Sequence, residues 1–363
     1  MGVSSLQSLL DRAAARSDPA LWHRQAGAWT PGGDGPGRDV RELAAALLHY
    51  GVEPGRAVLV LGADGPDTCR ASLAVLAAGA CLVRLEATVA DSVLRLALEG
   101  PEVAIAIVED ERQLRRVLAL RPDLPNLEMV ILLSGEPSER KAAAILVGTA
   151  VDLGAGRLEE DPGLLGRAHD GLPPDAPALL VATGDTLGWL SRAELAVAAE
   201  RLTDEMSFGP GRAVLVALPP GGPESIAIVL GALARGTTVL VTEELVQLAA
   251  GLREKPPDGA IVSAAVLRQL HAEWEEETAR RSGVARSLTR WALSQGADPA
   301  RHPRRYRLAE ILILSRIRGR YCGGLRGWGL LGAPAGREIS EFFAAIGVPI
   351  YVMPGVATAP VAR

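Results

Sequence analysis

Short, uninterrupted apolar runs alternate along the chain with stretches whose apolar residues recur at helical spacing. Residues 57–61 and 81–85 are the clearest runs, and such runs are typical of parallel strands covered on both faces. Residues 66–78 lie between them and have a helical pattern that Gly79 ends. Further strands are expected at 103–108 and 129–133, and further helices near 90–98 and 111–120. This order predicts a mostly parallel, doubly wound sheet.

The second half of the chain has the same alternation of expected strands and helices. Strands are expected at 213–218, 237–242, 260–263 and 349–352, and helices at 192–206, 223–233, 246–252 and 339–346. Residues 264–293 are expected to be mostly helical, and 311–317 and 325–331 to form strands or a helix–strand pair. Ser191 and Glu194 stand at the two positions of a capping box before the helix at 192–206.

A local repeat connects the two halves. The segment Gly51–Val60 is similar to Phe208–Val216, although chance in an Ala-, Val- and Gly-rich chain is a competing explanation. The sequence therefore predicts an α/β fold with two pseudo-repeated, mostly parallel doubly wound sheets and flanking helices. We expect a first subdomain over residues 1–175 and a second over 176–363, with a less regular, Gly- and Pro-rich link from about 134 to 177.

The bulk composition narrows the function classes. Hydrophobic residues make up 48% and charged residues 22%, as in a packed globular protein. A net charge of −5 and an aromatic content of 4% argue against nucleic-acid binding. The three cysteines lack metal-ligand spacing, no apolar run reaches about 18 residues, and no signal-peptide core begins the chain. We expect a cytoplasmic protein with no transmembrane segment and no metal-ligand set.

Residues 179–189 read as a buried strand that runs into a Gly/Thr turn. Thr183, Gly184, Thr186 and Gly188 suit a loop that wraps phosphate oxygens, because bare backbone N–H groups can approach closely. Such loops normally add a Lys or Arg, but here the turn carries Asp185 and the next cation is Arg192. The pattern predicts a nucleotide site that has lost its cation; an ordinary strand-to-helix turn is the alternative.

Several short segments stand in a characteristic order: Gly51–Val58, Pro125–Ile131, Gly332–Ile339 and Phe342–Tyr351. In this order and spacing the chain resembles the large N-terminal domain of acyl-adenylate-forming, AMP-binding enzymes, in particular long-chain acyl-CoA synthetases. The family's loop T-S-G-T-T-G-x-P-K-G cradles the ATP phosphates, and its Tyr-Gly-x-Thr-Glu motif closes the site. The resemblance implies nucleotide contacts at Thr183, Gly184, Thr186, Gly188, Gly332, Ala333, Pro334, Gly355 and Thr358.

The chain also departs from the family pattern. The Pro-Lys-Gly end of the loop is absent, and Pro354–Thr358 lacks the Glu that binds Mg²⁺ in the family. Leu218–Gly222 lacks the family's His, and we expect the mobile C-terminal domain with its catalytic Lys to be absent. ATP or AMP remain candidate ligands, Mg²⁺ is not expected, and no catalytic residue is assigned.

These departures predict a degenerate, acyl-CoA synthetase-like pseudoenzyme of fatty acid metabolism. Its adenylation chemistry would be lost or severely weakened, while acyl or nucleotide binding could remain, because removing one charge-stabilising group typically costs ~10²–10³ in rate. Two alternatives stay open. The chain could be an active adenylating component that a partner chain completes, or a non-catalytic regulatory or structural subunit of an active homologue or homo-oligomer.

Overall fold

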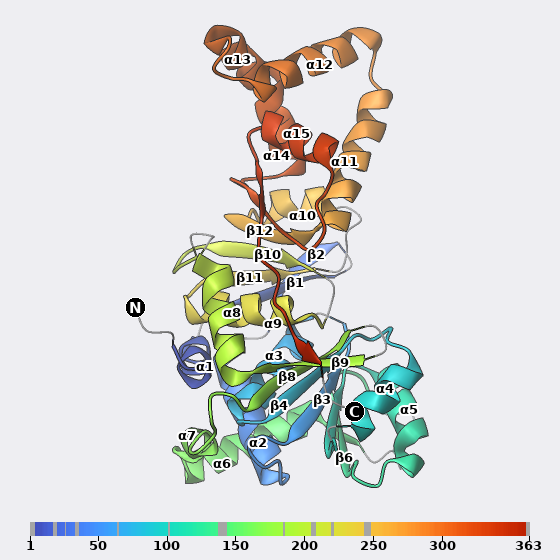
Figure 1. The fold of residues 1–363 in the computed structure, drawn as a ribbon, viewed down its shortest axis with the longest axis vertical. Coiled ribbons are helices and arrows are strands. Elements are labelled where there is room, and N and C mark those ends of the chain that lie inside the picture. Colours follow the sequence, from blue (N-terminus) through green and yellow to red (C-terminus); the bar gives the residue numbers. More distant parts are fainter. Residues whose placement is uncertain are drawn as a thin grey trace.

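The computed structural model describes residues 4–16, 20–25, 27–32, 36–63, 65–100, 102–136, 144–183, 186–204, 208–218, 221–242 and 248–360. Over these residues the chain forms two β-sheets that follow each other along the long axis of the molecule, with helices between and beyond them (Figure 1). The expected α/β class with two mostly parallel sheets is confirmed.

Sheet A is built largely from the second half of the chain. Its described strands are β1 (Leu21–Gln25), β2 (Ala28–Pro31), β10 (Ala213–Ala217), β11 (Thr238–Val241), β12 (Gly259–Ser263), β13 (Trp328–Leu331) and β14 (Ile350–Val352). They lie in the order β14-β13-β12-β10-β11-β1-β2, and every neighbouring pair except β1–β2 is parallel. The N-terminal hairpin β1–β2 thus completes the sheet of the other half.

Sheet B is built largely from the first half. Its described strands are β3 (Ala57–Leu61), β4 (Cys81–Leu85), β5 (Ile105–Val108), β6 (Met129–Leu132), β7 (Ala144–Leu146), β8 (Pro177–Thr183), β9 (Thr186–Ser191) and β15 (Ala359–Pro360). They lie in the order β15-β9-β8-β4-β3-β5-β6-β7, with β9 and β15 antiparallel to their neighbours. The two sheets therefore exchange strands across the boundary expected near residue 175, and the division into two subdomains stays a prediction.

The helices form three layers around the two sheets. Their bounds are α1 (Leu6–Ala14), α2 (Pro36–His49), α3 (Pro66–Ala77), α4 (Asp91–Glu99), α5 (Glu111–Leu120), α6 (Val147–Glu160), α7 (Leu164–Ala168), α8 (Arg192–Asp204), α9 (Pro223–Ala234), α10 (Leu248–Glu254), α11 (Ala264–Ala279), α12 (Gly283–Ala297), α13 (Pro303–Ala309), α14 (Ser315–Tyr321) and α15 (Arg337–Ala345), with the 3₁₀ turn η1 (Arg121–Asp123) and the π-helical turn η2 (Glu310–Leu314).

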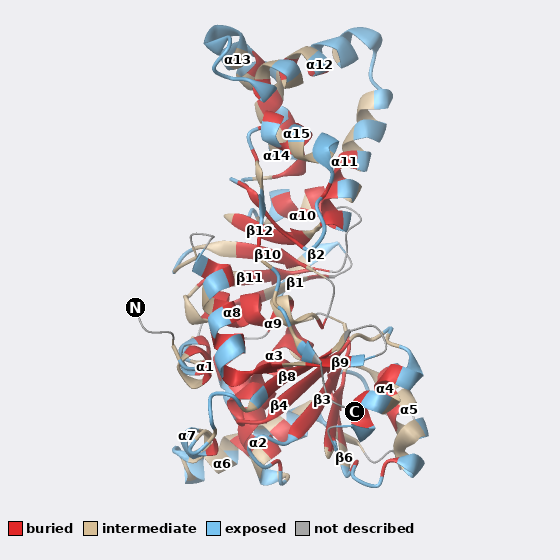
Figure 2. Cartoon of the chain, in the orientation of Figure 1, coloured by how far each residue is buried: buried red, intermediate tan, exposed pale blue. Residues whose placement is uncertain are grey.

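One apolar core joins the inner faces of both sheets through α3, α8 and α9, which lie between them (Figure 1). A second core packs α10, α11, α14 and α15 on the outer face of sheet A, and a third packs α4 and α5 on the outer face of sheet B. Figure 2 shows buried residues concentrated in the strands and in the helix sides that face them. The strands are continuous apolar runs because both faces of each sheet are covered.

The link expected to be irregular is partly helical, so this prediction was wrong in part. Residues 147–160 form α6 although the helix contains Gly148, Gly154 and Gly156, which lower helix propensity. Gly154 is buried against α2, and a Cβ there would stand 1.7 Å from the Glu42 carbonyl oxygen. Close packing on α2 therefore overrides the weak local preference for helix.

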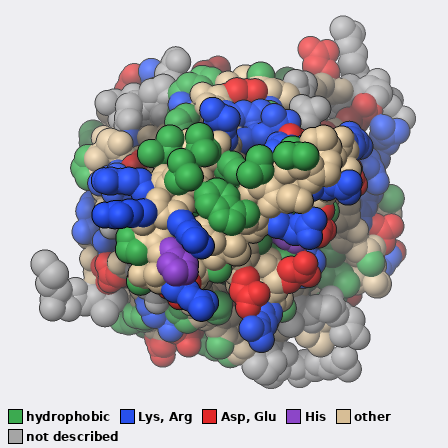
Figure 3. Space-filling model, turned by 90° about the horizontal axis from the view of Figure 1, so that it is seen from above, with side chains coloured by type: hydrophobic (Ala, Val, Ile, Leu, Met, Phe, Trp, Pro, Cys, Tyr) green, Lys and Arg blue, Asp and Glu red, His purple; other side chains and the backbone are tan. Residues whose placement is uncertain are grey.

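The stretch 311–317, left open between strand and helix, is helical in η2 and α14 and leads into strand β13. Together with α11, α12 and α13 it forms an extension at the end of the molecule farthest from sheet B (Figure 1). Figure 3 looks down on this end, where apolar and basic side chains share the surface. Among the described helices, none has the length and apolar character needed to cross a bilayer.

Candidate functional site

The strand order of sheet A creates a crevice at one place on its carboxyl edge. From β10 the chain moves to β11 on one side, and it then returns to β12, β13 and β14 on the other side. The loops that leave β10 and β12 therefore diverge, which opens a crevice beyond the ends of these strands. Open α/β sheets bind their ligands at such switch points, so this is where the fold favours a site.

A cavity of about 420 Å³ lies at this switch point. Its walls come from three strand ends and the helices that follow them: Leu218, Gly222, Glu224 and Ser225 after β10, Ser263, Ala264, Ala265 and Arg268 after β12, and Leu331, Gly332 and Ala333 after β13. Gly332 has a φ of +84°, a left-handed conformation that glycine adopts without strain and that lets β13 turn sharply at the cavity wall.

The electrostatics of the cavity favour an anionic group. Helices α9 and α11 both begin at its wall, and their N-cap residues, Gly222 and Ser263, provide no side-chain cap. Their first-turn N–H groups and helix dipoles therefore point positive charge toward the cavity. Arg268 is exposed there and has no hydrogen bond or ion pair with the part of the chain that the structure describes.

One carboxylate, Glu224, also lines the cavity, and it holds the segment that follows β14. Its Oε1 accepts a hydrogen bond from the Val356 backbone N–H at 3.0 Å. Arg201 on α8 donates to the carbonyl of Gly355 at 3.0 Å. These two contacts fix residues 355–356 beside the cavity, on the wall that contains Glu224.

The same segment continues to sheet B. Thr358 comes directly before β15, whose Ala359 and Pro360 pair with Trp189 and Gly188 of β9. Residues 355–360 thus connect the carboxyl edge of sheet A with the hairpin that contains Gly188. Pro334 follows the cavity wall in sequence and is exposed, but it does not line the cavity.

The Gly/Thr stretch connects two antiparallel strands, so the alternative of a strand-to-helix turn was wrong, while phosphate binding by this stretch stays a prediction. Strands β8 and β9 pair from Pro177–Ser191 to Thr183–Thr186, which leaves two residues between them. Those two, Gly184 and Asp185, lie outside the described residues.

The cation expected nearest to this stretch, Arg192, does not face the hairpin turn. It begins α8 and is buried, and its Nη2 donates to Nδ1 of His169 at 2.5 Å. Ser191 and Glu194 form the capping box that the sequence indicated, with Glu194 Oε2 accepting from the Ser191 N–H at 2.8 Å and Ser191 Oγ accepting from the Glu194 N–H at 3.1 Å.

The His169 contact gives stability a pH dependence. Burial lowers the pKa of His169, and the Arg192 charge lowers it further; Nδ1 accepts from Arg192 while Nε2 faces the Ala77 carbonyl at 2.9 Å. The unfolded chain binds a proton at His169 more readily than the folded chain does. The contribution of His169 to the free energy of unfolding is therefore fully present above about pH 6.5 and is lost as the pH falls below this value.

We expect the free energy of unfolding of His169→Gln, measured in urea, to fall less than that of the wild type between about pH 7.5 and 5.5. The exposed His49→Gln should keep the wild-type slope, and equal slopes for all three proteins would contradict this assignment.

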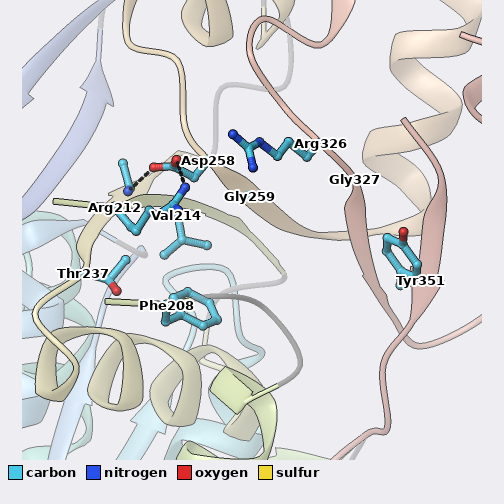
Figure 4. A pocket seen from close by; sticks show the side chains of 10 residues that line it. Phe208, Arg212, Val214, Thr237, Asp258, Gly259, Arg326, Gly327 and Tyr351 are labelled. Atoms are coloured by element: carbon cyan, nitrogen blue, oxygen red, sulfur yellow. Dashed lines mark hydrogen bonds and ion pairs between the residues drawn. The ribbon is translucent and has the colours of Figure 1, made fainter. Parts of the chain in front are cut away.

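A second cavity of about 290 Å³ lies on the opposite, amino edge of sheet A (Figure 4). The Asp258 carboxylate accepts from Arg212 at 2.7 Å and from the Ala213 N–H at 2.9 Å. Burial alone would raise the pKa of Asp258, but these hydrogen bonds and the charges of Arg212 and Arg326 lower it. Its charge is thus already satisfied, and ligands of open α/β sheets bind at the carboxyl edge. We therefore place the candidate site at the switch point.

The cavity contains residues that the sequence analysis did not identify. Arg268, Glu224 and Ser263 belong to no recognised motif, and they become neighbours only because β10 and β12 are adjacent in the sheet. A weak signal was present: Ser263 ends an apolar run, and Arg268 follows five residues later, near the start of the next helix.

Sequence comparison adds the family. A model of the AMP-binding enzyme family matches residues 37–356. The chain belongs to this family. Its relatives include the long-chain-fatty-acid–CoA ligase FadD15 of Mycobacterium bovis, which is 22% identical over 86% of this chain and 53% of its own length. Another is the ligase ACSBG2 of Xenopus laevis, 21% identical over 87% of this chain and 45% of its own length. The chain thus spans about half the length of these AMP-binding relatives.

Solved structures of adenylate-forming enzymes have the same fold. A putative long-chain-fatty-acid CoA ligase from Rhodopseudomonas palustris matches 98% of this chain and 78% of its own with a TM-score of 0.67 and 14% identity. Acetoacetyl-CoA synthetase from Streptomyces lividans matches 96% of this chain and 50% of its own, with a TM-score of 0.67 and 18% identity.

The described residues at the switch point do not fit the magnesium ion that the AMP-binding family implies. Residues 354–358 contain no carboxylate, and the carboxylate of Glu224 already accepts the Val356 N–H. Mg²⁺ requires near-octahedral oxygen ligands, usually carboxylates together with substrate phosphates. We therefore derive no step through a metal ion. The nucleotide itself fits better, because Arg268 and two helix N-termini face the cavity.

Proposed function

We propose that this chain binds an acyl chain, a nucleotide or the acyl-adenylate that combines them in the switch-point cavity, and that its adenylation chemistry is lost or severely weakened. The observation that carries the proposal is the absence of any Lys or Arg from residues 183–188 and of any carboxylate from residues 354–358. Adenylation requires a carboxylate to attack the α-phosphate of ATP while the charge on the triphosphate is neutralised.

Three features support the weakened chemistry. The Gly/Thr turn contains Asp185 and no Lys or Arg, Arg192 is buried on His169, and the closing segment offers a Thr358 hydroxyl where the family has a metal-binding Glu. Each missing charge-stabilising group typically costs ~10²–10³ in rate, although such losses need not multiply. The polyphosphate is therefore the part of the substrate that this site would hold least well.

Other features support retained binding. Leu218, Leu331 and the alanines at the start of α11 give the cavity apolar walls. Arg268 and the first turns of α9 and α11 could hold one anionic group, such as the phosphate of AMP or the carboxylate of a fatty acid. In this arrangement the protein's residues bind and orient a ligand with a single anionic centre, which an acyl-adenylate has and a triphosphate does not.

Two measurements on the full chain test the proposal. Calorimetric titration should detect binding of AMP or of a non-hydrolysable long-chain acyl-adenylate analogue, and Arg268→Gln should weaken it about tenfold through loss of one charge-assisted contact. Arg112→Gln, an exposed arginine on α5 far from the cavity, is the matched control and should leave the affinity unchanged. ATP–pyrophosphate exchange with Mg²⁺ and fatty acids should stay at least about 100-fold below ordinary turnover.

The outcomes separate the alternatives. Exchange at about 1 s⁻¹ or faster by the chain alone would overturn the loss of chemistry. Exchange that requires a co-purifying chain would favour the partner-completed component instead. If neither AMP nor the analogue binds, the ligand-binding proposal fails and the regulatory or structural subunit becomes the better account.

A further inference from the structure

The part of the helical extension that follows α11 has a charge unlike that of the rest of the chain. Residues 280–320 contain eleven arginines and two acidic residues, Asp298 and Glu310, which gives this segment a net charge of +9 in a protein of net charge −5. The segment covers α12, α13, η2 and α14, which lie at the end of the long axis opposite sheet B (Figure 1). The positive charge is therefore concentrated at one end of the molecule.

Most of these arginines are free to bind something else. Four form ion pairs with Glu276, Glu277 or Glu310. Seven are exposed, and their guanidinium groups have no acidic partner within the described part of the chain: Arg286, Arg290, Arg301, Arg304, Arg305, Arg307 and Arg316. These guanidinium groups make no ion pair that stabilises the fold, so they are available for contacts outside the chain.

Large apolar side chains are exposed in the same segment. Of the ten exposed large hydrophobic residues among the described ones, five lie between residues 284 and 312: Val284, Leu288, Leu308, Ile311 and Leu312. Leu288 of α12 and Leu312 of η2 line one cavity of about 640 Å³, together with Arg316 and Arg320. In Figure 3 the apolar side chains gather on this end with Lys and Arg side chains around them. We call these five apolar residues and seven arginines the basic–apolar end.

We propose that the basic–apolar end docks on the surface of an anionic lipid bilayer. Arginines would contact the lipid phosphates while the aliphatic side chains enter the boundary between headgroups and acyl chains. Ile311 is 65% exposed and Val284 73% exposed, so both could enter this layer without any rearrangement of the fold. Glu276 and Glu277 at the end of α11 are neutralised by ion pairs with Arg280, Arg281 and Arg320, and the acidic residues of the two sheets and their helices lie farther along the long axis, where salt screens them over about 8 Å.

The combination of features favours a bilayer over other anionic partners. A nucleic acid would satisfy the arginines but leave the aliphatic side chains in water, and among the described residues this end has no exposed Trp, Tyr or Phe for base stacking. Self-association through this end would bring two surfaces of the same positive charge together. A bilayer with acidic headgroups accepts both the charge and the aliphatic groups.

Flotation of the full-length chain with vesicles tests the proposal. The protein should float with vesicles of phosphatidylcholine that contain about 30% phosphatidylglycerol at about 0.15 M salt, and it should not float with pure phosphatidylcholine. Arg304→Glu combined with Arg307→Glu should weaken partitioning about 30-fold, at about fivefold for each arginine lost. Leu288→Ser combined with Ile311→Ser should weaken it at least about fivefold, by removing the inserted aliphatic groups.

Matched variants separate this end from general charge and hydrophobicity. Arg41→Glu with Arg112→Glu changes the net charge equally on exposed arginines elsewhere, and Leu96→Ser with Val197→Ser removes exposed aliphatic groups elsewhere. Both controls should float like the wild type, and all variants should keep the wild-type melting temperature. The proposal is overturned if the wild type stays unbound, if the controls lose as much binding as the test variants, or if the protein binds a homopolymeric RNA but not the vesicles. It is also overturned if gel filtration shows a dimer that Leu288→Ser with Ile311→Ser dissociates while vesicle binding is absent.

Discussion

Replacing Arg84 by Met is expected to lower the free energy of unfolding by about 3–5 kcal/mol. Arg84 lies near the end of β4 with its side chain 1% exposed. Its guanidinium donates to the carbonyl oxygens of Gly62 at 2.9 Å, Ala63 at 3.1 Å and Leu85 at 2.5 Å. Met would fill much of the space but remove these charge-assisted hydrogen bonds, which contribute about 1.5–3 kcal/mol each. The Gly62 carbonyl would lose its donor among the described residues, whereas the Ala63 and Leu85 carbonyls keep bonds from Thr68 Oγ1 and the Gly62 N–H.

Urea unfolding of Arg84→Met and of Arg41→Met measures this effect. Arg41 on α2 is exposed, so its substitution should change stability by no more than about 0.5 kcal/mol. Arg84→Lys should fall between the two, because an ammonium group cannot span the same carbonyls as a planar guanidinium. If Arg84→Met is no worse than Arg41→Met, these hydrogen bonds do not stabilise the carboxyl edge of sheet B.

The strands that were predicted well are those whose burial shows as a continuous apolar run in the local sequence. Residues 57–61 and 81–85 appear in the structure with the expected bounds, because strands covered on both faces must be apolar at every position. The pairing of β1 with β11 had no local signal, since it joins Leu21 to Val239 across more than two hundred residues. Helix α6 was missed for a related reason: its glycines reduce local preference, and its close contact with α2 is tertiary.

The candidate site shows a similar division. Gly332 and Ala333 were identified through family resemblance, and both line the switch-point cavity. Arg268 was not identified, because its position at the cavity depends on β10 and β12 being neighbours in the sheet. No local sequence pattern indicates which strands are neighbours. The sequence left two interpretations of the connection between Thr183 and Thr186, because Thr, Gly and Asp suit tight turns and phosphate loops equally well. The structure adds that this connection joins two antiparallel strands.

The position of β13 connects stability with the site. Trp328 begins this strand between β12 and β14, and Gly332 at the cavity wall follows four residues later. The Trp328 side chain is completely buried, and its ring meets that of Phe343 on α15 edge-on at 5.6 Å. The ring therefore helps to set where β13 lies on the outer core of sheet A, and with it one wall of the cavity.

Trp328→Ala is expected to lower the free energy of unfolding by about 3–5 kcal/mol, the usual cost of emptying a buried aromatic site. Trp328→Phe keeps a ring against Phe343 and should cost less than half as much. Tyr351→Ala on the neighbouring β14 removes a side chain that is 61% exposed and should cost less than about 1 kcal/mol. Urea unfolding measures the three changes in the free energy of unfolding, and equal losses for Trp328→Ala and Tyr351→Ala would contradict this packing.

Because β13 supports the cavity wall, folded Trp328→Ala at low temperature should also bind AMP or the acyl-adenylate analogue more weakly than Trp328→Phe does.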